Sequence, residues 1–447
     1  MNRNDSSIAY WSRRIDWPLM AAVAALLIVG LVAVFSATSP MGAPMRYMTK
    51  QLVAVGVGLV GLFLLSSLNY QLFRSHPGVV YLSTVLLLIA VLLVGRKIHG
   101  ARSWIALGPL SFEPVEFAKI GFILVLAGIL DRSERDISSI RLLMGVFALA
   151  GVHMVLILLE PYLGGTLVYA PIVLGMLYFA GVQPIYLLAV IFYAGVAVGI
   201  PIVSTYFSVQ PQLLDLHPII RFFVGSAQTA HSAAELLFIT TSLIFALWWF
   251  IRKFQIRMPW QYPLFLSLIV AFGVFSAHMA QHVIKDYQRK RIVVFLSPGF
   301  DPLGAGYNIL QSEIAIGSGR FFGKGLFSGS QTQLGFLPEK HTDFIFSVIG
   351  EELGFIWASV VLASFGLLVW RAFVIATESQ DRFGTLIAAG VGCLFAFECV
   401  MNIGMVIGIL PVTGVALPFV SYGGSHIVSS LLAIGLLQSV NFRRYIY

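Results

Sequence analysis

Long apolar stretches, separated by short polar segments, run through almost the whole chain. Runs of about 20 apolar residues are long enough to cross a bilayer as helices. Glycine, proline and charged residues mark where such runs end. We therefore expect an all-α polytopic membrane protein. The pattern predicts about twelve transmembrane helices, near residues 17–37, 51–68, 77–95, 113–131, 142–160, 165–181, 184–203, 234–252, 260–282, 343–370, 383–409 and 421–441.

The composition agrees with a membrane protein. Of the 447 residues, 58% are hydrophobic and 11% are charged, whereas soluble proteins carry about 25% charged residues. The first apolar run, from Trp17 to about Ser36, is too long for a signal-peptide core, so we expect it to be retained. We expect residues 1–447 to form a single integral membrane domain. Cys393 and Cys399 fall in one predicted helix, about 120° apart around its axis, which excludes a disulfide while the helix holds.

The longest polar interruption runs from Lys285 to Asp343. It contains seven glycines between Gly304 and Gly329, a basic cluster, and Asp301 directly before a proline. A glycine-rich backbone can approach a ligand closely, and successive N–H groups in such turns can cradle a phosphate. Two interpretations are open. The stretch is either a site for an anionic substrate or an irregular surface loop whose glycines serve only turns.

Three motifs in this half of the chain resemble the SEDS family (shape, elongation, division and sporulation). They are DPLGAGY at residues 301–307, LPEKHTDFIF at 337–346 and GVALPFVSYGGS at 414–425. Several long motifs in the family's order are more specific than any single glycine pattern. The resemblance covers roughly residues 15–200 and 283–442.

The resemblance is closer to the elongation branch of the family (RodA) than to the division branch (FtsW). The residues that favour this assignment are Arg14, Ile15, Asp16 and Trp17, with Tyr287 and Gln288 before the glycine-rich stretch. Elongation is therefore the expected role.

Family members typically have ten spans, so the resemblance implies an insertion in this chain. Residues 202–282 would be the inserted segment with two extra hydrophobic spans. Residues 283–342 would form a large extracytoplasmic signature loop before the last three helices. The Lys and Arg residues of the short loops favour cytoplasmic locations for both termini. The many cations of 96–119 and 285–340 then fall on the outer side, where functional charge would explain them.

Glu116 and Lys119 lie near the start of the fourth predicted helix. They are three residues apart and share one helix face. Because a charge at the bilayer centre costs at least about 2.5–3.5 kcal/mol, such residues normally face a partner or a wet cavity. They either contact the substrate or neutralise each other, and both match family positions. Arg102 stands one residue before the place of a family arginine, which Ser103 occupies, so its role is left open.

Other polar residues depart from the family or have a structural interpretation. Tyr162 replaces a family acid, and whether Glu160 takes over its function is left open. Thr342 and Asp343 are expected to cap the tenth helix. We expect a further set of intramembrane polar residues to hydrogen-bond within the bundle rather than to catalyse: Glu351, Glu352, Glu398 and Asn402.

The resemblance implies an enzyme, a peptidoglycan glycosyltransferase that polymerises lipid II into glycan strands for cell-wall elongation in the bacterial inner membrane. Asp301 is the acid of the family motif and is expected to be the catalytic base for the acceptor hydroxyl. The expected substrate-binding residues are Glu116, Lys119, Arg102, Lys324, Gly304, Gly306, Gln311 and Ser312.

The alternative function is a lipid II flippase, in which the intramembrane charges would line a path. We favour the enzyme because the densest motif lies in the outer loop and no repeated halves are found. The resemblance also implies a partner, a class B penicillin-binding protein with transpeptidase activity. Neither a nucleic acid nor a cofactor is expected. A protein-bound metal is not expected either, since the sequence contains no metal-ligand spacing. Whether a divalent cation binds with the pyrophosphate is left open.

Overall fold

The structure is a computed structural model that describes residues 14–98, 101–107, 110–209, 230–254, 259–283, 294–295 and 306–444. Two of the predicted site residues, Asp301 and Gly304, lie outside the described residues. The chain divides into two compact units. The main unit comprises Met1–Val182 and Asn308–Tyr447, and the second unit comprises Gln183–Tyr307.

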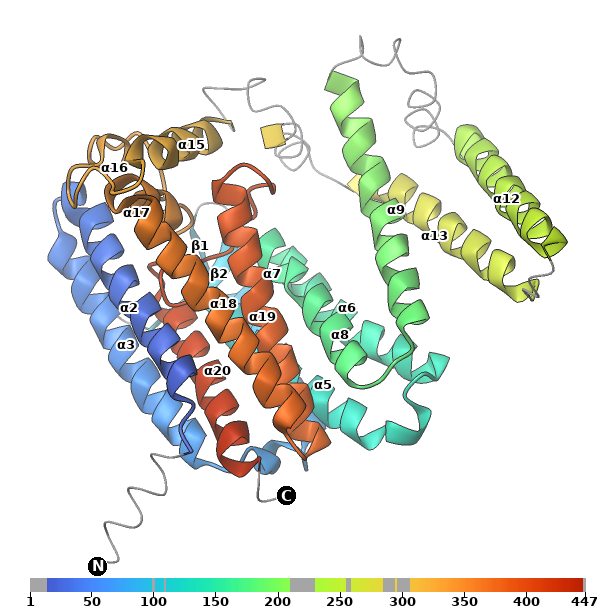
Figure 1. The fold of residues 1–447 in the computed structure, drawn as a ribbon, viewed down its shortest axis with the longest axis horizontal. Helices are drawn as coiled ribbons and strands as arrows, with labels where there is room; N and C mark the ends of the chain where they lie inside the picture. Colours follow the sequence, from blue (N-terminus) through green and yellow to red (C-terminus); the bar gives the residue numbers. More distant parts are fainter. Residues whose placement is uncertain are drawn as a thin grey trace, which may run out of the picture. The chain divides into compact units, whose positions relative to one another are not determined.

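The main unit is built from helices, with one small sheet (Figure 1). Its N-terminal elements are α2 (Trp17–Thr38), α3 (Pro44–Ser67), α4 (Pro77–Val94), β1 (Arg96–Ile98), β2 (Ala101–Leu107), β3 (Leu110–Phe112), α5 (Pro114–Arg132), α6 (Ile140–Leu159), α7 (Leu163–Leu167) and α8 (Tyr169–Phe179). Its C-terminal elements are α15 (Tyr307–Gly319), α16 (Ser330–Gln333), α17 (Ile345–Glu352), α18 (Gly354–Glu378), α19 (Arg382–Val406) and α20 (Gly424–Arg443). Short 3-10 turns lie at Ser39–Met41, Tyr70–Phe73 and Glu134–Asp136.

In the second unit, the described residues form three long helices, α9 (Pro184–Val209), α12 (Ala230–Lys253) and α13 (Gln261–Val283). Among the described residues, ten helices of the chain are long and apolar enough to cross a membrane. The predicted polytopic, mainly helical membrane protein is thus confirmed. Two of the twelve predicted spans are not among these ten. The span at 113–131 is α5, which is rich in charge, and the span at 165–181 is divided into α7 and α8.

The sheet was not predicted, and it corrects the all-α expectation locally. Its strand order is β1-β2-β3, and both pairs are antiparallel. Ile105 of β2 stands opposite Phe112 of β3, directly before α5 begins. β1 and β3 have only three residues each, and the seven residues of β2 (ARSWIAL) do not alternate between apolar and polar, so the sequence gives no strand pattern here. They fix the backbone that leads into α5.

The predicted helix at 343–370 is two helices, because the chain breaks between α17 and α18. Gly354 has φ +77°, a conformation that L side chains rarely adopt. The carbonyls of Glu351 and Glu352 accept hydrogen bonds from the loop amides of Lys324 (2.9 Å) and Gly325 (3.0 Å). In return, the amide of Phe355 donates to the carbonyl of Arg320 (2.9 Å). The loop after α15 therefore takes the hydrogen bonds that a continuous helix would have made.

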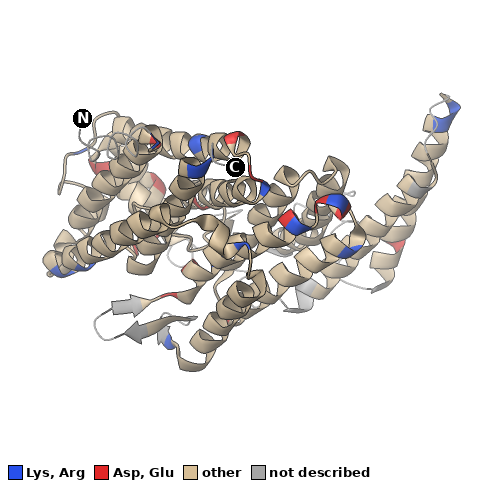
Figure 2. Ribbon diagram, turned by 90° about the horizontal axis from the view of Figure 1, so that it is seen from below, with Lys and Arg blue, Asp and Glu red and all other residues tan. Residues whose placement is uncertain are grey.

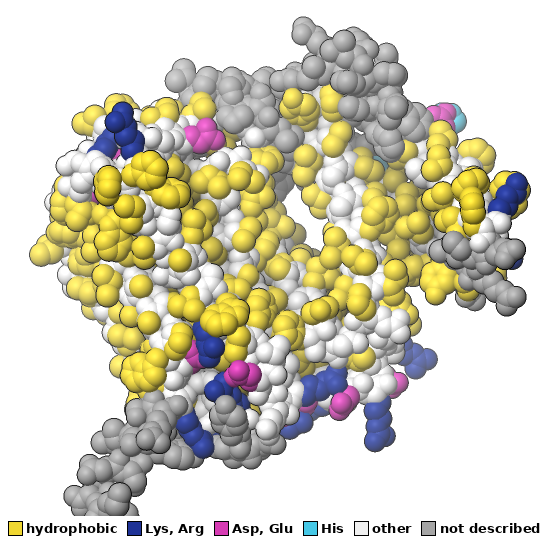
Figure 3. Space-filling view, viewed as in Figure 1, with side chains coloured by type: hydrophobic (Ala, Val, Ile, Leu, Met, Phe, Trp, Pro, Cys, Tyr) yellow, Lys and Arg dark blue, Asp and Glu magenta, His cyan; other side chains and the backbone are white. Residues whose placement is uncertain are grey.

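The core of the main unit lies around α19 and α20. About 78% of the α19 span and 89% of the α20 span are buried, whereas only 22% of the α3 span is. Hydrophobic side chains cover the outer helices of the main unit in Figure 3, and charged side chains gather near helix ends (Figures 2 and 3). An exposed apolar surface of this kind is what a bilayer would cover.

Candidate active site

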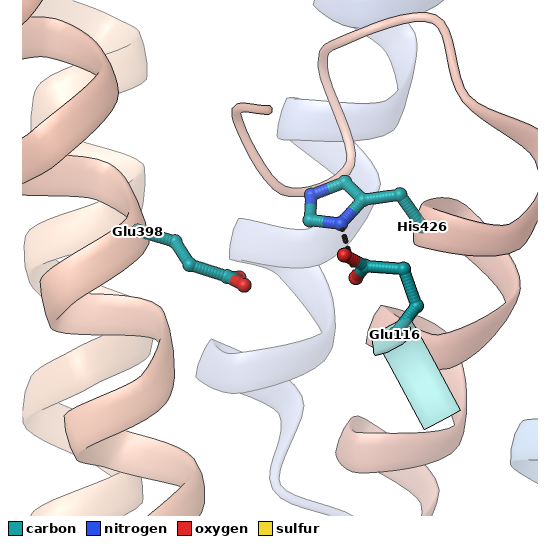
Figure 4. A group of neighbouring side chains, drawn as sticks. All are labelled: Glu116, Glu398 and His426. Carbon is teal, nitrogen blue, oxygen red and sulfur yellow. Dashed lines mark hydrogen bonds and ion pairs between the residues drawn. The ribbon is translucent and has the colours of Figure 1, made fainter. Parts of the chain in front are cut away.

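Four charged or titratable side chains meet inside the main unit: Glu116 and Lys119 of α5, Glu398 of α19 and His426 of α20. We call them the Lys119 cluster. The Lys119 ammonium lies 2.8 Å from Glu116 Oε1 and 2.5 Å from Glu398 Oε1. His426 Nδ1 lies 2.7 Å from Glu116 Oε2. Figure 4 shows Glu116, Glu398 and His426 converging from their three helices. All four residues are buried.

Hydrogen bonds join the first turns of α5 and α20, and these bonds position the cluster. Pro114 lies in the first turn of α5, where its missing N–H costs little. The amide of Glu113, just before this turn, donates to Ser425 Oγ (2.9 Å) at the start of α20. One turn further along α20, Ser429 Oγ donates to Glu116 Oε2 (3.4 Å). Glu116 therefore has partners on both α5 and α20.

The charges of the cluster nearly balance. Two carboxylates and one ammonium leave a single negative charge, which protonation of His426 would neutralise. Buried charges persist when they are paired and hydrogen-bonded, and removing one partner of such a pair typically costs about 3–5 kcal/mol. The structure contains the Glu116–Lys119 ion pair, one of the two interpretations left open by the sequence. Lys119 also has a second carboxylate partner, Glu398, that the helix pattern did not identify.

The same residues resemble a set of metal ligands. Glu116, Glu398 and His426 each offer one ligand atom within 4.8 Å of the others. However, the Lys119 ammonium already bridges the two carboxylates, and it supplies the positive charge that a metal ion would bring. The geometry therefore favours the Lys119 ammonium, rather than a metal ion, as the cation of this cluster.

A second layer of polar groups lies around the start of α17. Asn402 of α19 donates from Nδ2 to the carbonyls of Asp343 (3.0 Å) and Val415 (2.7 Å). The expectation that Asn402 hydrogen-bonds within the bundle is confirmed. The expected capping of the tenth helix by Thr342 and Asp343 is wrong. The helix begins at Ile345, two residues later than predicted, so its N-cap residue is Phe344, which makes no side-chain cap.

Glu160, the possible replacement for the missing family acid, follows the last residue of α6. Its side chain is fully buried, and neither oxygen has a hydrogen-bond partner among the described residues. Burial raises the pKa of Glu160 to about 8. Burial therefore disfavours the charged form of this carboxyl group. Tyr162, two residues later, donates to the Gly414 carbonyl (3.5 Å).

Lys324, a predicted substrate contact, belongs to a different cluster. Its ammonium lies 2.9 Å from Glu351 Oε1 and 2.8 Å from Ser330 Oγ. Glu351 also accepts from the amides of Gln331 and Thr332 (both 2.9 Å) and from Thr332 Oγ1 (2.8 Å). We call Lys324, Ser330, Gln331, Thr332 and Glu351 the Glu351 latch. It holds the 324–333 segment against α17.

Further bonds secure the same segment. Glu352 accepts from Gln333 Nε2 (2.8 Å) and from Ser36 Oγ of α2. Lys340 donates to the Thr332 carbonyl. The expectation that Glu351 and Glu352 hydrogen-bond within the protein is confirmed, and their partners are largely loop groups.

The remaining predicted substrate contacts are scattered. Ser312 of α15 is buried, and its hydroxyl is bonded to Ser347 Oγ (2.7 Å) and the Val406 carbonyl (2.6 Å). Gln311 is half-buried on the same helix, and Gly306 is buried in the turn before it. Arg102 lies in β2, with its side chain outside the description. Among the predicted substrate-binding residues whose side chains the structure describes, Glu116 and Lys119 form an ion pair with each other.

A polytopic helical membrane protein with a buried ion cluster is the class that the fold and the site define. Comparison with known proteins identifies the family. The family model FtsW/RodA/SpoVE, described as "Cell cycle protein", matches residues 17–217 and 229–446. The chain therefore belongs to this family, the SEDS family of the sequence analysis.

Individual relatives cover almost the whole chain. The peptidoglycan glycosyltransferase RodA of Treponema pallidum is 34% identical, over 96% of this chain and 98% of its own. The probable peptidoglycan glycosyltransferase FtsW of Trichlorobacter lovleyi is also 34% identical, over 95% and 93%. A chain in a solved peptidoglycan synthase complex that coordinates polymerization and crosslinking superposes with a TM-score of 0.65, at 29% identity over 96% and 98%.

Proposed function

We propose that this chain is a peptidoglycan glycosyltransferase that polymerises lipid II into glycan strands. The observation that carries the proposal is the near full-length match to relatives named for this activity. The buried Lys119 cluster supports it, because a membrane enzyme that acts on a lipid-linked pyrophosphate needs a cation near the leaving group.

In this reaction one group must take a proton from the acceptor hydroxyl, and positive charge must stabilise the departing pyrophosphate. We assign the first role to Asp301, which lies outside the described residues. We assign the second to Lys119, whose ammonium is oriented in advance by Glu116 and Glu398. Lys324 is a weaker candidate for the second role, because Glu351 already pairs with it.

The topology that fits this mechanism has twelve spans, the ten apolar helices together with α5 and the α7–α8 pair. Both termini would be cytoplasmic, and the loop with Asp301 would face outward. Nine of these spans precede that loop, and an odd number of crossings from a cytoplasmic N-terminus would leave it on the outer side. Two variants, Ser330→Cys and Phe254→Cys, test this arrangement. A thiol reagent added outside the cell should label the cysteine at position 330 and should not label the one at position 254.

The partner in this proposal is a class B penicillin-binding protein that crosslinks the new strand. The solved complex that couples polymerization to crosslinking supports it. A role in elongation is the finer part of the proposal, since the RodA and FtsW relatives are equally similar at 34%.

Glycan synthesis from purified lipid II, with and without the partner, tests the function. Asp301→Asn keeps the size of the side chain but cannot accept the proton, so we expect a rate loss of about 10²–10⁴-fold. Asp136→Asn, an exposed carboxylate in a 3-10 turn, is the matched control and should keep normal activity.

Thermal unfolding of the same proteins separates chemistry from folding. Near-normal synthesis by Asp301→Asn would remove Asp301 from the mechanism. A wild-type protein that makes no strand but moves lipid II between leaflets would instead favour the transport function.

A further inference from the structure

The second unit holds an apolar groove between α9, α12 and α13. Its volume is about 410 Å³, within the range of roughly 300–1,000 Å³ that is common for ligand pockets. Among the described residues that line it, Tyr262 and Trp248 alone carry a polar group on the side chain. The lining residues are Ile185, Leu188, Ala189, Phe192, Ile244, Leu247, Trp248, Ile251, Tyr262, Pro263, Phe265, Leu266 and Ile269.

The groove lies at one end of these three helices. Its lining comes from the first turns of α9, the last turns of α12 and the first turns of α13. The stretch from Ile244 to Ile251 rises by about 10 Å along α12, which is one third of a hydrocarbon core of about 30 Å. The groove is therefore confined to one leaflet, on the side where α12 ends and α13 begins.

The same end of the unit is aromatic and positively charged. α12 finishes with Arg252 and Lys253. The Arg252 guanidinium lies 4.9 Å from the ring centre of Trp248, a lining residue, and the Lys253 ammonium lies 4.1 Å from that of Trp249. Trp260 and Tyr262 stand at the start of α13. Tryptophan and tyrosine are enriched at the level of lipid headgroups, where lysine and arginine attract anionic lipids.

Neither cation is paired with a carboxylate among the residues that the structure describes. Arg252 is thus held by its indole contact at the rim of the groove, with its positive charge available to an anion. An apolar channel in one leaflet with cations at its headgroup end matches the chemistry of a phospholipid. It does not match a soluble ligand, because the channel offers almost no hydrogen-bonding groups.

We propose that this groove binds an anionic phospholipid, with an acyl chain between α9, α12 and α13 and the phosphate at Arg252 and Lys253. The site shares no residue with the Lys119 cluster or the Glu351 latch. It gives a function to α12, of whose apolar span only 6% is buried within the protein. The lipid would fill the space that protein side chains leave open between this helix and its neighbours.

The test is lipid binding by the purified full-length protein in detergent, counted by native mass spectrometry. The probes are phosphatidylglycerol and phosphatidylcholine with identical acyl chains. We expect selective retention of phosphatidylglycerol. Arg252→Gln and Lys253→Gln should each weaken it about fivefold, since one cation near a headgroup contributes about that factor. Arg141→Gln, which removes an exposed cation from α6, is the matched control and should change nothing.

A second pair of variants tests the acyl-chain site. Ala189→Trp places a bulky side chain in the groove and should abolish selective retention, whereas Ala194→Trp on the exposed part of the same helix should not. Equal retention of the two lipids, unchanged in Arg252→Gln and Lys253→Gln, would overturn the proposal. So would normal binding by Ala189→Trp, or dimers of the wild-type protein that exclude lipid from this face.

Discussion

The Lys119 cluster and the Glu351 latch both contain a lysine paired with a buried carboxylate. They differ in which of the two residues makes most of the contacts. The side chain of Lys119 is 3% exposed and that of Lys324 is 28% exposed. In the cluster, the lysine is central, because two carboxylates from different helices share its ammonium. In the latch, the carboxylate is central, because Glu351 receives two backbone amides and two hydroxyls besides its lysine.

This difference indicates which residue of each pair matters. A buried lysine between two carboxylates cannot be removed without leaving like charges together in a medium of low polarity. A partly exposed lysine can be removed at little cost, since water replaces it as a partner. The ion pairs of Lys119 therefore stabilise the packed helices of the cluster. The ion pair of Lys324 contributes little to the stability of the 324–333 segment, which the other bonds to Glu351 hold in place.

The largest expected effect is that of Lys119→Met. The methionine keeps most of the side-chain volume but leaves Glu116 and Glu398 without their shared cation. We expect a loss of about 3–5 kcal/mol in the free energy of unfolding, together with loss of glycan synthesis. Chemical or thermal unfolding in detergent and a lipid II polymerisation assay measure the two effects.

A double variant separates the structural role of Lys119 from its role in the reaction. Lys119→Met with Glu398→Gln removes one positive and one negative charge and leaves Glu116 paired with His426. We expect stability to recover substantially while synthesis stays lost. Recovery of both would show that the ammonium only neutralises its neighbours, and Lys119 would then leave the proposed mechanism.

The two regions also differ in what the sequence could predict. Helix spacing placed Glu116 and Lys119 on one face, because i and i+3 positions are neighbours on any helix. Glu398 lies 279 positions from Lys119, and only the packing of α19 against α5 brings it there. No local pattern indicates such a contact. The signal that could have suggested it was the presence of a charge in an otherwise apolar span.

The Glu351 latch was harder to predict from the sequence, since backbone amides form several of its hydrogen bonds. The apolar pattern at 343–370 predicted one helix, yet loop amides take the carbonyls of Glu351 and Glu352 and divide it. Glycines at 323 and 354, both with φ +77°, permit this crossing. A hydrophobicity pattern contains no information on hydrogen bonds between distant backbone groups. The ten apolar spans were therefore predicted better than the break between α17 and α18.

A smaller but still clear effect is expected for Glu351→Ala. This change leaves the buried amide of Thr332 and its hydroxyl without their acceptor. An unsatisfied buried polar group costs about 1–3 kcal/mol. We expect the 324–333 segment to become sensitive to protease while α18 and α19 stay protected. Limited proteolysis followed by mass spectrometry locates the cleavage.

The latch should also respond to pH. Burial raises the pKa of Glu351, but hydrogen bonds from Lys324, Gln331 and Thr332 lower it more, so it lies below its ordinary value of 4.5. The carboxylate therefore stabilises the latch above about pH 4.5, and this stabilisation is lost as pH falls through the lowered pKa. Protease sensitivity of the wild-type protein should rise in acid, whereas Glu351→Ala should be sensitive throughout. Protection unchanged at low pH would contradict the carboxylate's role.

The smallest expected effect is that of Lys324→Met, and it sharpens the comparison most directly. Lys324 is one of five donors to Glu351, and its side chain reaches solvent. Partly exposed ion pairs contribute about 0.2–1 kcal/mol, so the latch should stay protected from protease and the unfolding temperature should hardly move. If glycan synthesis also stays normal, Lys324 is only an accessory to the latch. If synthesis falls while protection persists, Lys324 contacts the substrate and acts together with Lys119 in the reaction.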